Sequence, residues 1–280
     1  MKSSALKAML FVCMIACVGI ASAGPITTWQ VDVSAIFDKD TLVWEVDPWQ
    51  DGDWISPTSL RWGWEGFDGL RSRSGLDIID SPASAPVNTN GPAVANISVT
   101  HLNQPIVGTA LDSVVILSTL TLTPLIPSGP GFSATLPFNV NFLETFNEPD
   151  TDTCADGGQN GVGVNINGCA DIFVIDPSSL SFDFRYLDLD GTPFLRTYNI
   201  SFFELTSGLN PLPDVACTAA GATSPCSGFE TPEKTNTTFQ FAAQITTKIP
   251  EPTALALMGL GFAGFAYKRR RLKRKGSKVA

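Results

Sequence analysis

The stretch of sequence that decides the fold is residues 29–37, which has the sequence WQVDVSAIF. Apolar side chains recur at every second position, at Trp29, Val31, Val33, Ala35 and Phe37. Successive side chains of a β-strand point to opposite faces of the sheet, so this alternation places all five on one face. Residues 29–37 are therefore predicted to form a strand that packs against a hydrophobic core.

The same alternation recurs toward the C-terminus, at Phe182, Phe184 and Tyr186 and again at Phe239, Phe241, Ala243 and Ile245. The Asp- and Gly-containing segment 187–192 predicts a turn, so residues 180–187 and 194–205 are expected to form a hairpin. Further strands are expected at 41–46, 94–100, 113–122, 136–146 and 162–175. Long amphipathic helices are not predicted. The pattern favours an all-β fold, an antiparallel two-sheet sandwich with long loops.

The charge of the chain restricts its partners. Among 280 residues there are 18 Lys and Arg, 27 Asp and Glu, and a single His. Residues 1–23 hold two of the bases, and residues 250–280 hold eight bases and one acid, which leaves eight bases and 26 acids for residues 24–249. A domain this acidic is unsuited to neutralising phosphates, so no nucleic-acid partner is expected. One His also excludes any site that needs two imidazoles.

The N-terminus has the pattern of a secretory signal peptide. Lys2 and Lys7 precede an apolar run from Ala8 to Ile20, which is followed by the small residues Ala21-Ser22-Ala23. This order predicts a signal helix within residues 1–23 and cleavage by signal peptidase between Ala23 and Gly24. An uncleaved anchor is the alternative, but the apolar run is shorter than the ~20 residues of a membrane span.

The C-terminus has three parts of different chemistry. Pro250-Glu251-Pro252 precedes an apolar, glycine-rich stretch, 253–267, and a basic tail, 268–278. The stretch is expected to form a short transmembrane helix, and its basic flank should remain in the cytoplasm. The predicted organisation is thus a signal peptide (1–23), an exported acidic β-sandwich domain (24–249) and a C-terminal segment (250–280).

These last residues resemble the PEP-CTERM sorting signal of Gram-negative bacteria. The resemblance covers the Pro-Glu-Pro box at Pro250, Glu251 and Pro252, the short span and the arginine cluster at 269–271. It implies that exosortase, a membrane enzyme, processes the chain near the box. It also implies transient membrane anchoring, followed by release to the cell surface or to an extracellular polymeric matrix. An ordinary single-span anchor remains the alternative.

A second resemblance lies inside the exported domain. Thr100-His101-Leu102-Asn103 matches the signature of the THxN group of PEP-CTERM proteins. The resemblance assigns signature positions to Thr100, His101 and Asn103. It implies no activity.

Four cysteines remain after removal of the signal peptide, namely Cys154, Cys169, Cys217 and Cys226. An even number in an exported chain predicts disulfides. Of the three pairings we favour 154 with 169 and 217 with 226, because each closes a short loop. A zinc site of four thiolates is disfavoured, since no C-x-x-C spacing is present.

His101 is the single candidate for a general base at neutral pH. A hydrolase would use it to activate a Ser or Thr hydroxyl, yet no nucleophile elbow surrounds it. Because His101 follows the Ile97-Ser98-Val99 stretch, we favour a structural role, in which the imidazole forms a hydrogen bond at a strand end and fixes a loop together with Thr100 and Asn103.

Acidic loops suggest calcium as the one cofactor to consider. Glu148, Asp150, Asp152 and Asp156 offer oxygen ligands in a Gly-containing loop. The spacing does not fit the EF-hand loop. A solvated acidic loop without an ion is the alternative.

Five tryptophans, Trp44, Trp49, Trp54, Trp62 and Trp64, cluster in the segment 44–64. Exposed aromatic faces would allow stacking on sugar rings, as in a carbohydrate-binding module. Core packing of a strand pair is the favoured alternative, because Trp62 and Trp64 have the same-face spacing of one strand.

The sequence as a whole predicts a non-enzymatic surface or matrix protein, for which an extracellular polysaccharide is a candidate partner. A carbohydrate-binding module and a hydrolase using His101 are the other two hypotheses.

Overall fold

The computed structural model describes residues 24–45, 54–65, 73–145, 152–176, 180–188, 194–206 and 209–247. The chain divides into two units, residues 1–246 and 247–280, and the β-sheets belong to the first. The expected signal helix, the transmembrane helix at 253–267 and the Pro-Glu-Pro box lie outside the described residues. Within the described ranges, no helix has both the length and the apolar character needed to cross a membrane.

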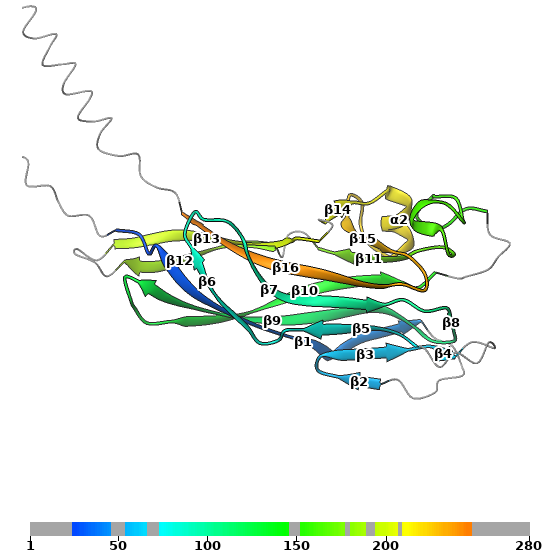
Figure 1. The fold of residues 1–280 in the computed structure, drawn as a ribbon, viewed down its shortest axis with the longest axis horizontal. Helices are drawn as coiled ribbons and strands as arrows, with labels where there is room; N and C mark the ends of the chain where they lie inside the picture. The colour runs from blue at the N-terminus through cyan, green and yellow to red at the C-terminus, as the bar shows by residue number, and fades with distance from the viewer. Residues whose placement is uncertain are drawn as a thin grey trace, which may run out of the picture. The chain divides into compact units, whose positions relative to one another are not determined.

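The first unit is built from two seven-stranded sheets whose pairings are antiparallel (Figure 1). The first sheet has the order β14 (Asn210–Pro211), β15 (Ser227–Thr231), β11 (Asp171–Ile175), β10 (Phe132–Leu143), β9 (Ala110–Ile126), β1 (Thr28–Glu45) and β6 (Ala83–Asn88). The second has the order β12 (Ser181–Asp188), β13 (Phe194–Glu204), β16 (Asn236–Thr247), β7 (Val94–Leu102), β5 (Ser74–Ile79), β3 (Ser59–Trp62) and β2 (Trp54–Ser56). A small third sheet pairs β4 (Trp64–Glu65) with β8 (Ile106–Val107). The all-β prediction is confirmed.

The structure confirms the first predicted strand, which is part of β1. Trp29, Val31, Val33, Ala35 and Phe37 are all buried, while the side chains between them are partly or fully exposed. They belong to the main hydrophobic core, which also contains Leu76 of β5, Val99 of β7 and Ile245 of β16. Since these strands belong to different sheets, the core lies between the inward faces of the two sheets.

Trp29 anchors one part of this core. Its ring makes edge-to-face contacts with Phe184, Tyr186 and Tyr198, at centroid separations of 5.1–5.5 Å. The Tyr198 hydroxyl accepts a hydrogen bond of 2.8 Å from the amide of Ile26. The predicted hairpin therefore exists as β12 paired with β13, and it packs on the predicted first strand.

A second, smaller core covers the outer face of β11. Ile172 and Val174 point away from the main core and pack against the short helix α2 (Asp214–Ala219), which supplies Ala216 and Cys217. In Figure 1, α2 lies beside β11 and β15. All five residues of β11 are consequently buried. On β15, Gly228 leaves room for this arrangement, because a Cβ atom there would overlap the carbonyl oxygen of Phe173.

Two strand predictions need correction. Residues 162–175 do not form one strand: β11 begins at Asp171, and the preceding segment contains a 3-10 turn, Gly163–Asn165. Gly161, Gly163 and Gly168 have positive φ there, which a strand does not accommodate. Residues 41–46 are not a separate strand either, since β1 continues to Glu45 through an irregular register between Asp38 and Val43.

Candidate functional site

In the first sheet, acidic residues occupy inward-facing positions at the ends of two core strands. In β10, Val140 and Phe142 point inward, and Glu144 continues the same register just beyond the strand end. In β11, Phe173 and Ile175 point inward, and Asp171 occupies the same face at the strand start. Leu143 is paired with Ile172, so Glu144 and Asp171 lie at the same end of neighbouring strands.

Two further strands place polar residues at this end of the core. On β15, Phe229 is part of the core, Thr231 is opposite Asp171, and Glu233 follows two residues later. On β7 of the second sheet, Val99 is part of the core and is followed in the same register by His101 and Asn103. Because every second residue of a strand faces inward, polar residues from both sheets lie in the interior at this end of the core.

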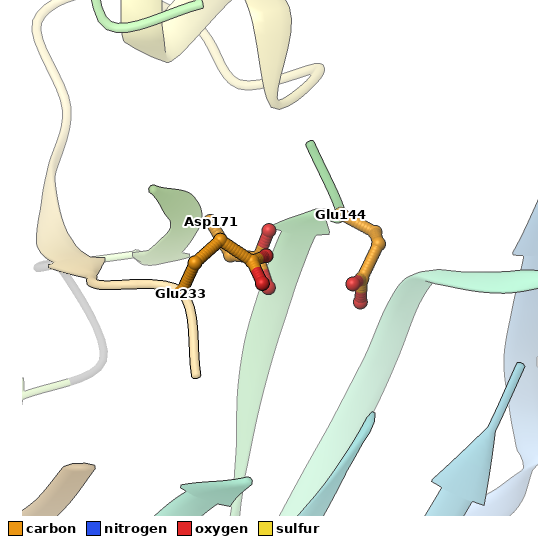
Figure 2. Close-up of side chains that lie close together, drawn as sticks. All are labelled: Glu144, Asp171 and Glu233. Carbon is orange, nitrogen blue, oxygen red and sulfur yellow. The ribbon is translucent and has the colours of Figure 1, made fainter. Parts of the chain in front are cut away.

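Three carboxylates meet at the centre of this group. Glu144 is 8% exposed, and Asp171 and Glu233 are each 0% exposed. One oxygen from each side chain can be chosen so that all three lie within 4.8 Å of one another. Figure 2 shows the carboxylates of Asp171 and Glu233 directed toward the side of the site from which Glu144 projects. We call Glu144, Asp171 and Glu233 the carboxylate cluster.

Glu144 is held by two side chains of the second sheet. The indole nitrogen of Trp62 donates a 2.8 Å hydrogen bond to Glu144 Oε2, and the hydroxyl of Ser74 donates one of 3.3 Å to Oε1. Burial raises the pKa of Glu144 to about 8, and the neighbouring carboxylate of Glu233 acts in the same direction. At neutral pH, without a bound cation, this carboxyl group therefore favours its protonated form.

Asp171 has one oxygen satisfied and one that is not. The backbone amide of Thr145 donates a hydrogen bond of 2.8 Å to Asp171 Oδ1, and the Thr145 hydroxyl lies 3.2 Å from the same oxygen. Asp171 Oδ2 accepts no hydrogen bond from the described residues and lies 3.6 Å from His101 Nε2. Burial, with the charges of Glu144 and Glu233 added, raises the pKa of Asp171 well above its ordinary value.

His101 connects the two sheets. Its Nδ1 atom shares a 2.8 Å hydrogen bond with the hydroxyl of Thr231 on β15, and its ring stacks near Trp62. The ring is fully buried, and this burial lowers the pKa of His101 to about 3. The imidazole is therefore neutral at physiological pH, and its Nε2 atom, directed at Asp171, has no hydrogen-bond partner in the described part of the chain.

The other two signature residues, Asn103 and Thr100, face opposite sides of the second sheet. Asn103 donates a 2.9 Å hydrogen bond from Nδ2 to the backbone oxygen of Thr231, and its buried Oδ1 has no partner among the described residues. Thr100 lies on the opposite face of β7, where its hydroxyl bonds with that of Thr238 at 2.8 Å. The expected hydrogen bond of His101 is present, but it joins two strands of different sheets and does not fix a loop with Thr100.

The acidic loop predicted to bind calcium is organised differently. Glu148 and Asp150 lie outside the described residues, and Asp152 is exposed. Asp156 accepts hydrogen bonds of 2.9 Å from the Gly158 amide and from the Asn165 side chain. Its carboxylate therefore stabilises the loop. The calcium ligand set expected from the sequence stays a prediction.

The tryptophans of segment 44–64 do not form one surface. Trp62 is fully buried, Trp44 is partly buried with its ring 6.5 Å from that of Trp62, and Trp54 is 71% exposed. Trp62 and Trp64 are not on one strand, because Gly63, at a φ of +77°, separates β3 from β4. Trp49 and the side chain of Trp64 lie outside the described residues.

Both predicted disulfides are present, Cys154–Cys169 and Cys217–Cys226. The first closes the loop that leads into Asp171. Thr145 donates from its hydroxyl to the Cys169 carbonyl, and Asn167 donates to the Glu233 carbonyl at 3.2 Å. This disulfide loop therefore contacts the side chain of Thr145, next to Glu144, and the backbone of Glu233.

Reasoning from the sequence missed Glu144, Asp171 and Glu233. A signal for them was available, because each continues the inward register of a strand that carries a core phenylalanine, at Phe142, Phe173 and Phe229. Acidic residues in inward register are uncommon unless they are paired or bind a metal. These three residues lie together because of the order of the strands in the sheet. The alternation of apolar residues in the sequence does not reveal that order.

Comparison with models of protein families identifies the C-terminal segment. The model of the PEP-CTERM protein-sorting motif matches residues 248–271, which supports sorting of this chain to the cell surface by exosortase. No curated protein matches the sequence. The resemblance of the C-terminal segment to this sorting signal is thereby confirmed for the residues that carry it.

Proposed function

We propose that this chain is an exported, non-enzymatic surface or matrix protein that signal peptidase releases at Gly24 and exosortase processes near Pro250-Glu251-Pro252. The observation that carries the proposal is the match of residues 248–271 to the PEP-CTERM sorting motif. The matched segment follows directly on β16, which ends at Thr247.

The chemistry of the first unit fits an extracellular location. Two disulfides fasten its loops, and disulfides persist in oxidising compartments. The acidic composition of residues 24–249 keeps such a domain soluble outside the cell. We assign the chain to the THxN group on the tetrapeptide at 100–103, in which His101 and Asn103 have a structural task, since both bond to Thr231.

The buried state of His101 supports a non-enzymatic role. A general base has to reach a substrate proton and needs a pKa near the working pH. His101 is inaccessible, and its pKa is lowered to about 3. The carbohydrate-binding alternative is weakened by the burial of Trp62, although Trp54 remains an exposed aromatic face.

Cell fractionation and intact mass test the proposal together. In a Gram-negative host with exosortase, the surface fraction should contain a chain that begins at Gly24 and ends close to residue 250. The same host without exosortase should retain the chain in the membrane. Replacing Pro250, Glu251 and Pro252 by Ala should have the same effect, whereas Lys278→Ala, outside the matched residues, should change nothing. A surface chain that still contains Arg271 would contradict processing.

A further inference from the structure

We propose that Glu144, Asp171 and Glu233 form a buried binding site for one calcium ion. This inference goes beyond sorting and does not depend on it, because it concerns the interior of the first unit. It also differs from the calcium loop predicted from the sequence, which lies at 148–156.

The oxygens of the three carboxylates lie close enough together to bind one calcium ion. Calcium binds oxygen ligands at about 2.3–2.6 Å, so two oxygens on one ion are at most about 5 Å apart. The three carboxylates offer oxygens that all lie within 4.8 Å of one another. They come from three adjacent elements of the first sheet, the end of β10, the start of β11 and the segment after β15. One ion can therefore be reached by all three without rearrangement of the sheet.

The negative charges of the carboxylate cluster favour a bound cation. Glu144, Asp171 and Glu233 are buried in a medium where an isolated carboxylate is poorly solvated and where like charges repel strongly. A divalent cation between them offsets both effects at once. Three carboxylates and one calcium ion leave a single net negative charge, next to the indole of Trp62 and the amide of Thr145, which already donate to the cluster.

Some buried polar atoms at this end of the core have no hydrogen-bond partner among the described residues. Asp171 Oδ2, His101 Nε2 and Asn103 Oδ1 are buried and make no hydrogen bond there. His101 Nε2 is directed at the cluster, 3.6 Å from Asp171 Oδ2. Buried polar atoms in folded proteins are almost always satisfied by protein, water or an ion. An ion bound to Asp171 Oδ2 would satisfy that oxygen directly.

The ligand set favours calcium over other ions. Carboxylates can bind calcium with one or two oxygens each, which helps to reach the six to eight ligands that it takes. Magnesium requires near-octahedral ligands at about 2.1 Å and keeps several waters, for which this buried site is unsuited. Zinc prefers nitrogen and sulfur ligands, and His101 is the single imidazole of the chain.

Calcium binding can be measured on the full chain after treatment with EDTA. Calorimetric titration should show one calcium ion per chain, and calcium should raise the melting temperature. Asp171→Asn and Glu144→Gln should each weaken binding at least about 10-fold, because each removes one charged ligand. Asp183→Asn, the same change at an exposed position of β12, should bind as the wild type does.

Terbium luminescence gives a readout on the wild-type chain itself, so it does not depend on whether a variant folds. Tb³⁺ replaces calcium and luminesces when a nearby tryptophan is excited, and Trp62 is hydrogen-bonded to Glu144. The wild-type chain should show this signal, and calcium should compete it away. Trp62→Phe should reduce the signal while calcium still binds.

Three results would overturn the proposal. The first is that calcium causes no change in the wild-type chain. The second is that zinc binds more tightly than calcium. The third is that Asp152→Asn abolishes calcium binding while Asp171→Asn does not, which would place the ion in the loop. None of these results bears on processing at the C-terminus, so the sorting proposal stands or fails separately.

Discussion

His101 illustrates how a single side chain can hold two sheets together. It belongs to β7 of the second sheet, yet its Nδ1 atom bonds to Thr231 of the first. Its ring also contacts Phe142 of β10 edge-on, at a centroid distance of 5.1 Å. The imidazole therefore contributes packing and a hydrogen bond at the same position, and neither contribution requires a charge.

Replacing His101 by Ala should destabilise the fold by about 2–4 kcal/mol, since the change leaves a cavity and removes the bond to Thr231. The free energy of unfolding in urea measures this. Thr100→Ala, on the opposite face of the same strand, serves as the matched control and should cost about 1 kcal/mol or less. A His101→Ala protein as stable as the wild type would contradict the structural role.

In protein stripped of divalent ions, stability should fall as the pH rises from about 6.5 to 8. Burial raises the pKa of Glu144 from 4.5 to about 8, so its contribution is complete below pH 4.5 and is lost as the pH rises through 8. His101 acts with the opposite sign, because its pKa is lowered from 6.5 to about 3, so its contribution is complete above pH 6.5 and is lost toward pH 3. Between pH 6.5 and 8 the carboxyl group therefore dominates.

Urea unfolding in EDTA at pH 6.5 and at pH 8 checks this sign. Glu144→Gln cannot titrate and should show a smaller difference between the two pH values, the remainder coming from Asp171, whose pKa is also raised. Stability that increases over this window would show that Glu144 is ionised in the folded protein at pH 6.5.

At the scale of strands, most of the fold was predictable. The alternation at 29–37 and at 239–245 identified β1 and β16, because each strand has one face in the core. The prediction of one strand over 162–175 was wrong for residues 162–170, which are apolar enough for a strand but form a loop, because they contain glycines at positive φ and a disulfide cysteine. The order of strands in the sheets was not predictable, and the carboxylate cluster depends on that order.

The disulfide loop 152–170 should influence the ion site. The bond Cys154–Cys169 spans 15 residues, and a loop of that size is expected to stabilise the fold by about 3 kcal/mol. The loop also accepts a hydrogen bond from the Thr145 hydroxyl at the Cys169 carbonyl, and its Asn167 side chain donates one to the Glu233 carbonyl. Replacing both cysteines by Ser should therefore lower stability and also weaken calcium binding, as unfolding in urea and calorimetric titration would measure.

The matched control is the double Ser replacement of Cys217 and Cys226. That disulfide belongs to the second core, which lies under α2 on the face of β11 opposite to Asp171. Its removal should lower stability while leaving calcium affinity close to that of the wild type. Equal loss of affinity in both double variants would show that the loop has no particular influence on the site.

At the scale of the whole chain, the core residues of the described part and the sorting motif lie in different segments of the sequence. The hydrophobic cores draw their buried residues from between Ile26 and Ile245. The sorting motif occupies residues 248–271 and begins directly after β16. This division explains why the two kinds of sequence signal could be recognised independently, one by alternation and the other by the order of box, apolar stretch and basic tail.

Removing residues 250–280 should leave the stability of the exported domain unchanged. Ile245, the last buried core residue in the part of the chain that the structure describes, is fixed within β16, where its carbonyl accepts a 2.8 Å hydrogen bond from the Asn90 amide. A chain that ends at Ile249 keeps this bond and both cores, so its melting temperature in calorimetry should lie within about 2 °C of the full chain. Gly228→Ala, which places a Cβ against the Phe173 carbonyl, should lower it clearly and shows that the measurement responds to damage in the sheet. A large loss on truncation would mean that the C-terminal segment contributes to the fold, and processing at the box would then destabilise the protein that it releases.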